Sequence, residues 1–322
     1  MRWAALLAPA AGFYALGAAL LLVETAPAHM ADFRVPAAPA GEREPITPIP
    51  PPPDADPREV ALGEHLFADP RLSGDGARAC TSCHDVGSNG ADNRTRNPAH
   101  GAAKPLLDVS TVFNAALSYR LGWEGKIRTL EAQAQEAIES PASMGGRVDD
   151  VLARLRDDAE IAQAFRAVFG RGPDRDGLLR ALATYERSLV TPDSRFDLWL
   201  RGDSSALSPE ERSGYDLFRS LGCVSCHQGV NVGANLLQRH GIFHPLASPE
   251  PAILRVPSLR NVAETAPYFH DGSAPTLREA VRRMALAQLN QTLADDDIDR
   301  IAAFLKTLTG RYRGRPVTPP RS

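Results

Sequence analysis

Three residue types that carry specific chemistry are scarce in this chain: its 322 residues include only 4 Cys, 4 Met and 3 Trp. Charge of one sign is not in excess, because 36 Lys and Arg against 39 Asp and Glu leave a formal charge of −3. This balance lacks the basic footprint of a nucleic-acid-binding protein. Alternating strand patterns are also scarce. The ordinary hydrophobic and charged fractions, 43% and 23%, exclude disordered, collagen-like and multi-span membrane chains.

A long apolar run begins the chain. Met1 and Arg2 are followed by 21 uncharged residues, Trp3 to Val23, and Ala26-Pro27-Ala28 offers a cleavage site. The run exceeds the ~7–15 apolar residues of most signal peptides and suits a spanning helix. Residues 1–28 are therefore interpreted as a signal peptide or an uncleaved membrane anchor. Both alternatives predict a periplasmic protein, either soluble after cleavage or tethered to the inner membrane.

Residues 29–55 are interpreted as a Pro-rich linker. Nine prolines lie within residues 31–57, including the run Pro50 to Pro53. Such a segment favours polyproline II and is not expected to contribute to a core.

An internal duplication follows the linker. Asp56-Pro-Arg-Glu and Ser208-Pro-Glu-Glu each predict a capped helix start, and each helix carries Gly-x-x-Leu-Phe, Gly63 to Phe67 and Gly214 to Phe218. The repeat predicts domains at 56–205 and 206–315, with a tail at 316–322. Apolar spacing predicts further helices over 130–139, 148–155, 178–189, 276–287 and 297–308, the last closed by Gly310.

All four cysteines belong to two copies of one motif, Cys80-Thr-Ser-Cys83-His84 and Cys223-Val-Ser-Cys226-His227. The spacing suits attachment of two thiols to the vinyl groups of a haem, with the adjacent histidine as the proximal iron ligand. Zinc or dithiol redox chemistry is the alternative. The pairs lie 143 residues apart (223 − 80), too far for an ordinary zinc ribbon, and neither alternative explains a histidine after both pairs.

The sixth iron ligands decide what such haems do. Met284 lies on a predicted helix after the second motif, where it is either an axial ligand or a core residue. His100 is the one histidine in the loop after His84, and ligation competes there with a solvated role.

These motifs resemble the bacterial diheme cytochrome c peroxidases and the related diheme enzymes of methylamine utilisation. The resemblance covers about residues 56–315, and its most specific stretch runs from Val256-Pro-Ser-Leu-Arg to Tyr-Phe-His270-Asp-Gly-Ser. It implies an all-α fold of two tandem cytochrome c-type domains. The N-terminal haem would be the peroxide site and the C-terminal haem the high-potential electron-transfer site.

The resemblance also implies roles for single residues. Met284 matches the axial methionine of the peroxidases, where the methylamine-utilisation branch has a tyrosine, and His100 matches a releasable distal histidine. Trp123 matches a tryptophan between the haems, and Gln133 matches a distal-pocket residue. A calcium ion lies between the haems of the family, and its matching ligands here are Asp108, Thr265 and Pro267.

One position departs from the family. Where the family has the Glu of Asn-Pro-x-Glu-Met, this chain reads Ser140-Pro-Ala-Ser143-Met144. A serine hydroxyl orients peroxide but is a poor base at neutral pH. Glu136 and Glu139 lie nearby and are interpreted as solvated.

The resemblance predicts an enzyme that reduces hydrogen peroxide to water with electrons from a small cytochrome c or a cupredoxin. A donor would reduce the Met284 haem, His100 would leave the other haem, and Trp123 would pass an electron between them. The alternatives are a diheme oxidase acting on a protein partner and a non-catalytic electron-transfer cytochrome. Homodimers are common in the family.

Overall fold

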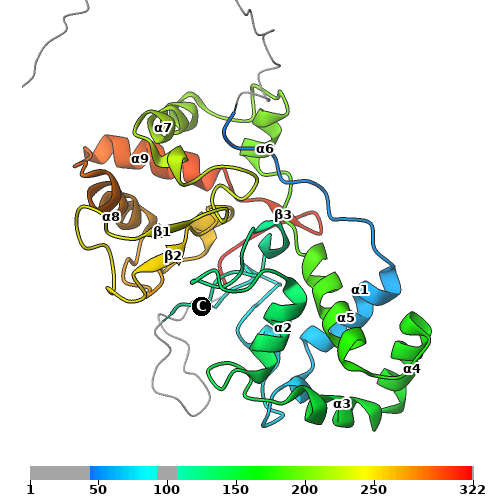
Figure 1. Cartoon of the computed structure of the whole chain (residues 1–322). Helices are drawn as coiled ribbons and strands as arrows, with labels where there is room; N and C mark the ends of the chain where they lie inside the picture. Colours follow the sequence, from blue (N-terminus) through cyan, green and yellow to red (C-terminus); the bar gives the residue numbers. More distant parts are fainter. Residues whose placement is uncertain (1–43, 93–106, 321–322) are drawn as a thin grey trace, which may run out of the picture. The chain divides into compact units, whose positions relative to one another are not determined.

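Helices dominate the described part of the chain, residues 44–92 and 107–320, in the computed structural model (Figure 1). The predicted leader at 1–28 and His100 lie outside the described residues. No helix within the described ranges is both long and apolar enough to cross a membrane.

The N-terminal half contains five α-helices that share one hydrophobic core. They are α1 (Pro57–Phe67), α2 (Leu130–Glu139), α3 (Val148–Arg156), α4 (Ala159–Phe169) and α5 (Arg175–Ser188). The predicted start of α1 is confirmed, since the Asp56 side chain accepts a hydrogen bond from the Arg58 amide. The expected helices over 130–139, 148–155 and 178–189 are present within a few residues, whereas α4 was not predicted.

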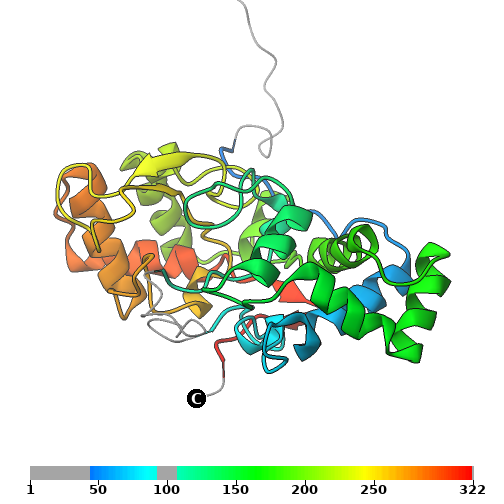
Figure 2. The same ribbon diagram turned by 60° about the horizontal axis from the view of Figure 1, so that its bottom comes forward.

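The C-terminal half forms a second core. Its helices are α6 (Arg195–Leu200), α7 (Pro209–Ser220), α8 (Leu277–Leu289) and α9 (Asp295–Lys306). Figure 2 shows α7, α8 and α9 gathered apart from the helices of the N-terminal half. Phe196 of α6 belongs to this second core, where its ring lies 5.4 Å from that of Trp199. Trp199 therefore packs against this core and has a structural role.

Sheet is limited, in the residues described, to two antiparallel pairs. β1 (Leu237–Arg239) pairs with β2 (Ile253–Arg255), and β3 (Arg311–Tyr312) pairs with β4 (Arg315–Pro316). The first pair lies between the second Cys-x-x-Cys-His motif and η6 (Val262–Glu264).

The two copies of Gly-x-x-Leu-Phe perform the same packing function. A Cβ at Gly63 would lie 2.1 Å from the Ala181 carbonyl oxygen of α5, and one at Gly214 would lie 1.9 Å from the Arg300 carbonyl oxygen of α9. Both distances are far below van der Waals contact, so only glycine lets each helix pair approach this closely. A Cβ at Gly310 would likewise lie 1.9 Å from the Thr191 carbonyl oxygen. Gly310 also lies three residues beyond Thr307, the residue that caps the C-terminus of α9. The expectation that Gly310 closes the helix is therefore wrong.

A second repeat connects the two halves. Asn114 and Asn261 both adopt left-handed backbone conformations, φ 61° and 59°, and lie 147 residues apart (261 − 114). Each precedes a short 3-10 helix, η4 (Ala115–Leu117) and η6 (Val262–Glu264). At the same offset, Thr129 caps α2 and Thr276 caps α8. Both asparagine side chains donate to the hydroxyl of Thr191, at 2.8 and 2.9 Å, so the equivalent turns meet at one residue.

The ends of the described chain cross between the two cores. Ile46 and Ile49 are 0% and 1% exposed, and Ile46 belongs to the C-terminal core. Figure 1 shows this segment, in blue, running from beside α6 to the start of α1. The expectation that residues 29–55 contribute nothing to a core is therefore wrong for residues 46 and 49, because isoleucines between the prolines fill apolar sites. At the other end, Val317 of the predicted tail is buried in the N-terminal core.

Candidate functional site

Both Cys-x-x-Cys-His motifs have the same local geometry. Each first cysteine opens a 3-10 turn, η3 (Cys80–Ser82) and η5 (Cys223–Ser225). The amide of His84 donates to Cys80 O at 2.9 Å, and that of His227 donates to Cys223 O at 3.0 Å. These tight turns hold two thiols and one imidazole together, as covalent haem attachment requires.

A backbone carbonyl group orients the imidazole ring of each histidine. Nδ1 of His84 lies 3.1 Å from Gly90 O, and Nδ1 of His227 lies 3.2 Å from Val232 O. A carbonyl accepts, so each Nδ1 carries the proton and each Nε2 is left as a ligand. Burial lowers the pKa of His227 to about 4 and that of His84 in the same direction, so both rings are neutral.

The phenylalanines of the duplicated Gly-x-x-Leu-Phe pack beside these ligands. The ring of Phe67 lies 6.4 Å from that of His84, and the ring of Phe218 lies 6.3 Å from that of His227. The helix repeat and the motif repeat therefore build one site twice.

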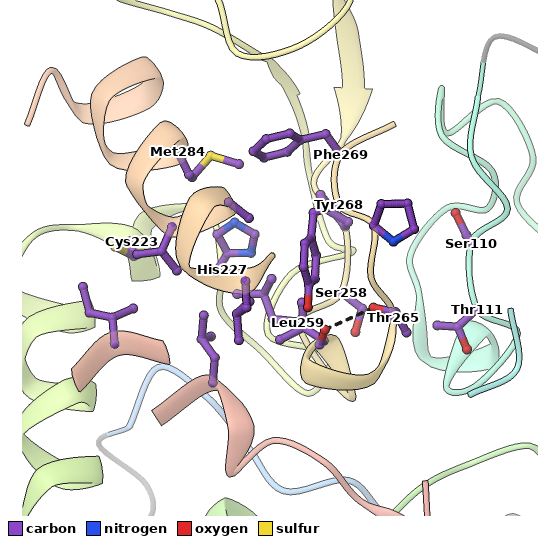
Figure 3. Close-up of a pocket in the computed structure, with 18 of the residues that line it drawn as sticks. Ser110, Thr111, Cys223, His227, Ser258, Leu259, Thr265, Tyr268, Phe269 and Met284 are labelled. Carbon is purple, nitrogen blue, oxygen red and sulfur yellow. Dashed lines mark hydrogen bonds between the residues drawn. The ribbon is translucent and has the colours of Figure 1, made fainter. Parts of the chain in front are cut away.

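A cavity of about 210 Å³ contains the second motif. Cys223, His227 and Met284 all line it, together with apolar side chains of α8 and α9. Figure 3 shows His227 and Met284 near Cys223, and Ser110 and Thr111 at the other end. Tyr268 lies between the two ends. The apolar walls and the two potential axial ligands suit a haem held between His227 and Met284.

Zinc and dithiol chemistry fit less well. No group of three or more His, Cys, Asp and Glu side chains within the described ranges is arranged to hold a metal ion. Burial raises the pKa of Cys80 to about 12 and that of Cys223 to about 11, the opposite of a reactive thiolate. Thioether attachment, in which neither sulfur is ionised, is consistent with this environment.

The helices α2 and α8 differ at the position of Met284. The offset of 147 residues that relates α2 to α8 places Ala137 where the second half has Met284 (284 − 147). Gln133 lies one turn earlier on α2, and its Oε1 is buried with no hydrogen-bond partner. The position equivalent to Met284 thus carries a methyl group in place of a thioether, and α2 also carries a buried acceptor without a hydrogen-bond partner.

Trp123 and His270 are equivalent in the repeat and face each other. Their ring centroids lie 6.2 Å apart with the planes at 68°. The indole Nε1 donates to Asp108 O at 2.7 Å, and the Asp108 amide donates to His270 O at 2.7 Å. Trp123 therefore lies where the two halves meet. It also lines the cavity that contains the second motif.

The three expected calcium ligands lie around that cavity. Asp108, Thr265 and Pro267 all contribute to its wall. Burial raises the pKa of the Asp108 carboxyl to about 7, and the negative charges of Asp92 and Asp271 add to this effect. A bound cation would offset both contributions.

The remaining predicted residues lie nearer the surface. Ser143 is exposed, and its amide donates to Ser140 O at 2.9 Å. Glu136 and Glu139 are exposed as well, and Glu139 accepts from Gln135 at 3.0 Å. The expectation that these two carboxylates are solvated is therefore confirmed.

Sequence reasoning missed Glu186 on α5. It is 8% exposed, and burial raises the pKa of its carboxyl to about 8, although Arg187 acts in the other direction. Its charge also acts on the Cys80 thiol, which places it near the first motif. A glutamate within an otherwise helical pattern gives no signal of this burial.

The equivalence of positions 108 and 255 in the repeat was also missed, although the sequence contains the signal. Asp108-Val-Ser-Thr-Val-Phe-Asn114 and Arg255-Val-Pro-Ser-Leu-Arg-Asn261 share valine, a hydroxyl residue and asparagine at the same spacing.

Comparisons with known proteins agree with this geometry. Residues 57–205 match the family described as di-haem cytochrome c peroxidase, and residues 212–309 match cytochrome c. The cytochrome c551 peroxidase of Nitrosomonas europaea is 38% identical over 296 residues, which cover 86% of this chain and 88% of the relative. The cytochrome c551 peroxidase of Pseudomonas aeruginosa is 38% identical over 78% of each chain.

A solved structure shares the fold. The crystal structure of a MauG-like protein associated with microbial copper homeostasis has a TM-score of 0.71 and 26% identity, with coverage of 81% of this chain and 93% of that one.

Proposed function

Because the chain belongs to the di-haem cytochrome c peroxidase family, we propose that it reduces hydrogen peroxide to water with electrons from a small redox protein. Two electrons and two protons convert one peroxide into two waters. When bound, the two haems supply electron transfer and cleavage of the peroxide O–O bond.

The observation that carries the proposal is the difference between Ala137 and Met284. A methionine opposite His227 would close the second haem to substrate and raise its potential. At the equivalent position of the first site the repeat places Ala137, whose methyl group cannot bind iron. Of two otherwise repeated sites, one is therefore suited to electron transfer and the other to a small substrate.

The chain's own residues prepare the first site for peroxide. Gln133 presents its unsatisfied Oε1 as an acceptor for a peroxide proton. Trp123, at the meeting of the halves, provides an aromatic path for the electron from the second site. His100 and Ser143 are proposed as a releasable ligand and a peroxide-orienting hydroxyl, on the resemblance alone.

The proposal is tested by steady-state turnover of the holoprotein with peroxide and a reduced small cytochrome c. Ala137→Met should lower peroxide turnover at least tenfold, because the first iron gains a permanent sixth ligand. The spectrum of the half-reduced protein should then be that of two six-coordinate haems. Ala132→Met, at an exposed position of the same helix, is the matched control. Turnover no faster than free haem in the wild-type protein, even after half-reduction, would contradict the peroxidase assignment.

The alternatives give different results in the same experiment. A diheme oxidase would consume peroxide only with a protein partner present. An electron-transfer cytochrome would show two six-coordinate haems before any substitution, in the half-reduced state as well as in the oxidised state.

Calcium is proposed at Asp108, Thr265 and Pro267. Support comes from the buried Asp108 carboxyl and its acidic neighbours. Metal analysis should find one Ca²⁺ per chain in the wild-type protein and less than a tenth of that in Asp108→Ala. Equal calcium in both proteins would contradict the assignment.

We also propose a periplasmic location, with the protein either free or tethered through residues 1–28. The apolar run at the start of the chain and the c-type attachment motifs support it. The donor is proposed to be a small cytochrome c or a cupredoxin, and the enzyme a homodimer, by analogy with the family.

A further inference from the structure

Arg255 is a buried cation at the wall of the cavity that contains the second motif. It ends β2, is 8% exposed and lines the cavity together with Trp123 and His227. Its side chain donates one hydrogen bond, from Nε to Gly122 O at 3.0 Å. Within the described ranges, no carboxylate forms an ion pair with it.

Arg260, five residues later, shows how the same fold treats a buried arginine that has its partners. Its guanidinium bonds Asp197 at 2.8 Å, Val230 O at 2.8 Å and Thr47 O at 2.8 Å. Leaving a buried charge without a partner is strongly destabilising. Arg255 therefore requires an anion that the described protein residues do not provide.

The cavity indicates which anion this is. Cys223 fixes the vinyl edge of the haem at one end, and a haem carries its two carboxylates on the opposite edge. Figure 3 shows that the hydroxyl residues Ser110 and Thr111 lie at the end away from Cys223. Arg255 lies beside Trp123 at the boundary with the N-terminal half, as these hydroxyl residues do.

We infer that Arg255 pairs with a carboxylate of the second haem and positions that edge of the cofactor against the Trp123 loop. This inference rests on the haem assignment, not on peroxide chemistry. The planar guanidinium offers two Nη groups for a carboxylate while Nε remains bonded to Gly122.

The repeat gives independent support. Arg255 is equivalent to Asp108 at the offset of 147 residues (255 − 108). The Arg255 amide donates to Trp123 O at 2.7 Å, just as the Asp108 amide donates to His270 O at 2.7 Å. The two equivalent positions thus hold side chains of opposite charge type. Asp108 is proposed to bind a calcium ion, whereas Arg255 is itself positively charged. Each fixes the peptide that bears one of the two facing rings.

The test measures the reduction potentials of both haems by spectroelectrochemical titration of the holoprotein. Removal of a positive charge near the iron disfavours reduction. Arg255→Gln should therefore lower the reduction equilibrium constant of the second haem about tenfold, or 59 mV for one electron. The first haem should change by less than threefold. Arg239→Gln, which removes an exposed arginine from the paired strand β1, is the matched control and should leave both potentials unchanged.

Resonance Raman spectroscopy of the haem propionate bending mode provides a second measurement. Arg255→Lys keeps the charge but loses the planar fork, so its potential should stay within threefold of wild type while the bending mode shifts. If Arg255→Gln fails to assemble with two haems, this mode in Arg255→Lys decides the question.

An unchanged potential in Arg255→Gln, or an unchanged bending mode in Arg255→Lys, would overturn the inference. An equal shift in Arg239→Gln would also overturn it, because any loss of charge would then act in the same way. The protein could show the expected shifts in Arg255→Gln and Arg255→Lys and yet have no peroxide turnover. That result would support the pairing of Arg255 with the haem carboxylate and contradict only the peroxidase assignment.

Discussion

At the scale of single residues, small differences separate two sites built on one plan. Both halves hold a histidine through Nδ1 and a backbone carbonyl, and both place a phenylalanine beside it. The difference between Ala137 and Met284 is the basis on which we propose a substrate site in one half and an electron-transfer site in the other. Only the structural repeat makes this comparison possible, because the sequence around the two positions is otherwise different.

A buried carboxyl near the first motif gives a prediction for pH. Burial raises the pKa of Glu186 to about 8, so the folded protein binds a proton that the unfolded chain releases near 4.5. The stabilisation is complete below the unfolded pKa and is lost as pH rises through 8. Between about pH 5 and 8, this one group lowers the free energy of unfolding by up to about 1.4 kcal/mol per pH unit.

Glu186→Gln should flatten this dependence and stabilise the protein at pH 8. Urea unfolding of both proteins at pH 5.5 and 8 is the measurement. Glu136→Gln, at an exposed site, is the control and should retain the wild-type profile. Parallel profiles for the wild type and Glu186→Gln would show that the carboxyl is ionised in the folded protein.

At the scale of elements, close helix packing holds each half together. The pairs α1–α5 and α7–α9 touch at Gly63 and Gly214, where a methyl group would collide with backbone. Backbone atoms cannot turn aside as a flexible side chain can. The same glycine therefore appears in both copies of the repeat for a packing reason rather than for a turn.

Gly214→Ala should lower the free energy of unfolding by about 1–3 kcal/mol or more, because α7 must move away from α9. Gly172→Ala is the control, since no atom lies within 4 Å of its added Cβ. Thermal unfolding of the two variants measures the difference. Equal midpoints would mean that the contact at Arg300 O is easily relieved.

At the scale of the whole molecule, the two ends of the described chain tie each half to the other's core. Ile46 comes before the N-terminal helices in sequence but packs in the C-terminal core, and Val317 does the reverse. Arg260 reinforces the first crossing through its bond to Thr47 O. Neither half is therefore complete within its own stretch of sequence.

Ile46→Ala should cost about 2–5 kcal/mol, the range for a large buried aliphatic side chain. Ile253→Ala, at a residue that is 58% exposed, should cost much less. Chemical unfolding followed by haem absorbance measures both. A small loss in Ile46→Ala would mean that residues 44–49 are dispensable for the C-terminal core.

The sequence by itself determined the attachment motifs, the capped helices that precede them and the family, and it marked Met284 as a candidate axial ligand. These features are local: a cap, a Cys-x-x-Cys-His turn and a helical period each lie within a few residues. It also marked Trp123, Gln133 and Asp108, but only through resemblance.

Only the tertiary structure decided which side chains meet. It placed Trp123 against His270 and Arg255 at the cavity wall. It buried Ile46, although this residue lies in a Pro-rich segment, and it left Ser143 exposed. Each of these facts depends on contacts between residues tens or hundreds of positions apart. Burial and pairing over such separations depend on how helices pack, and no local pattern of residues specifies them.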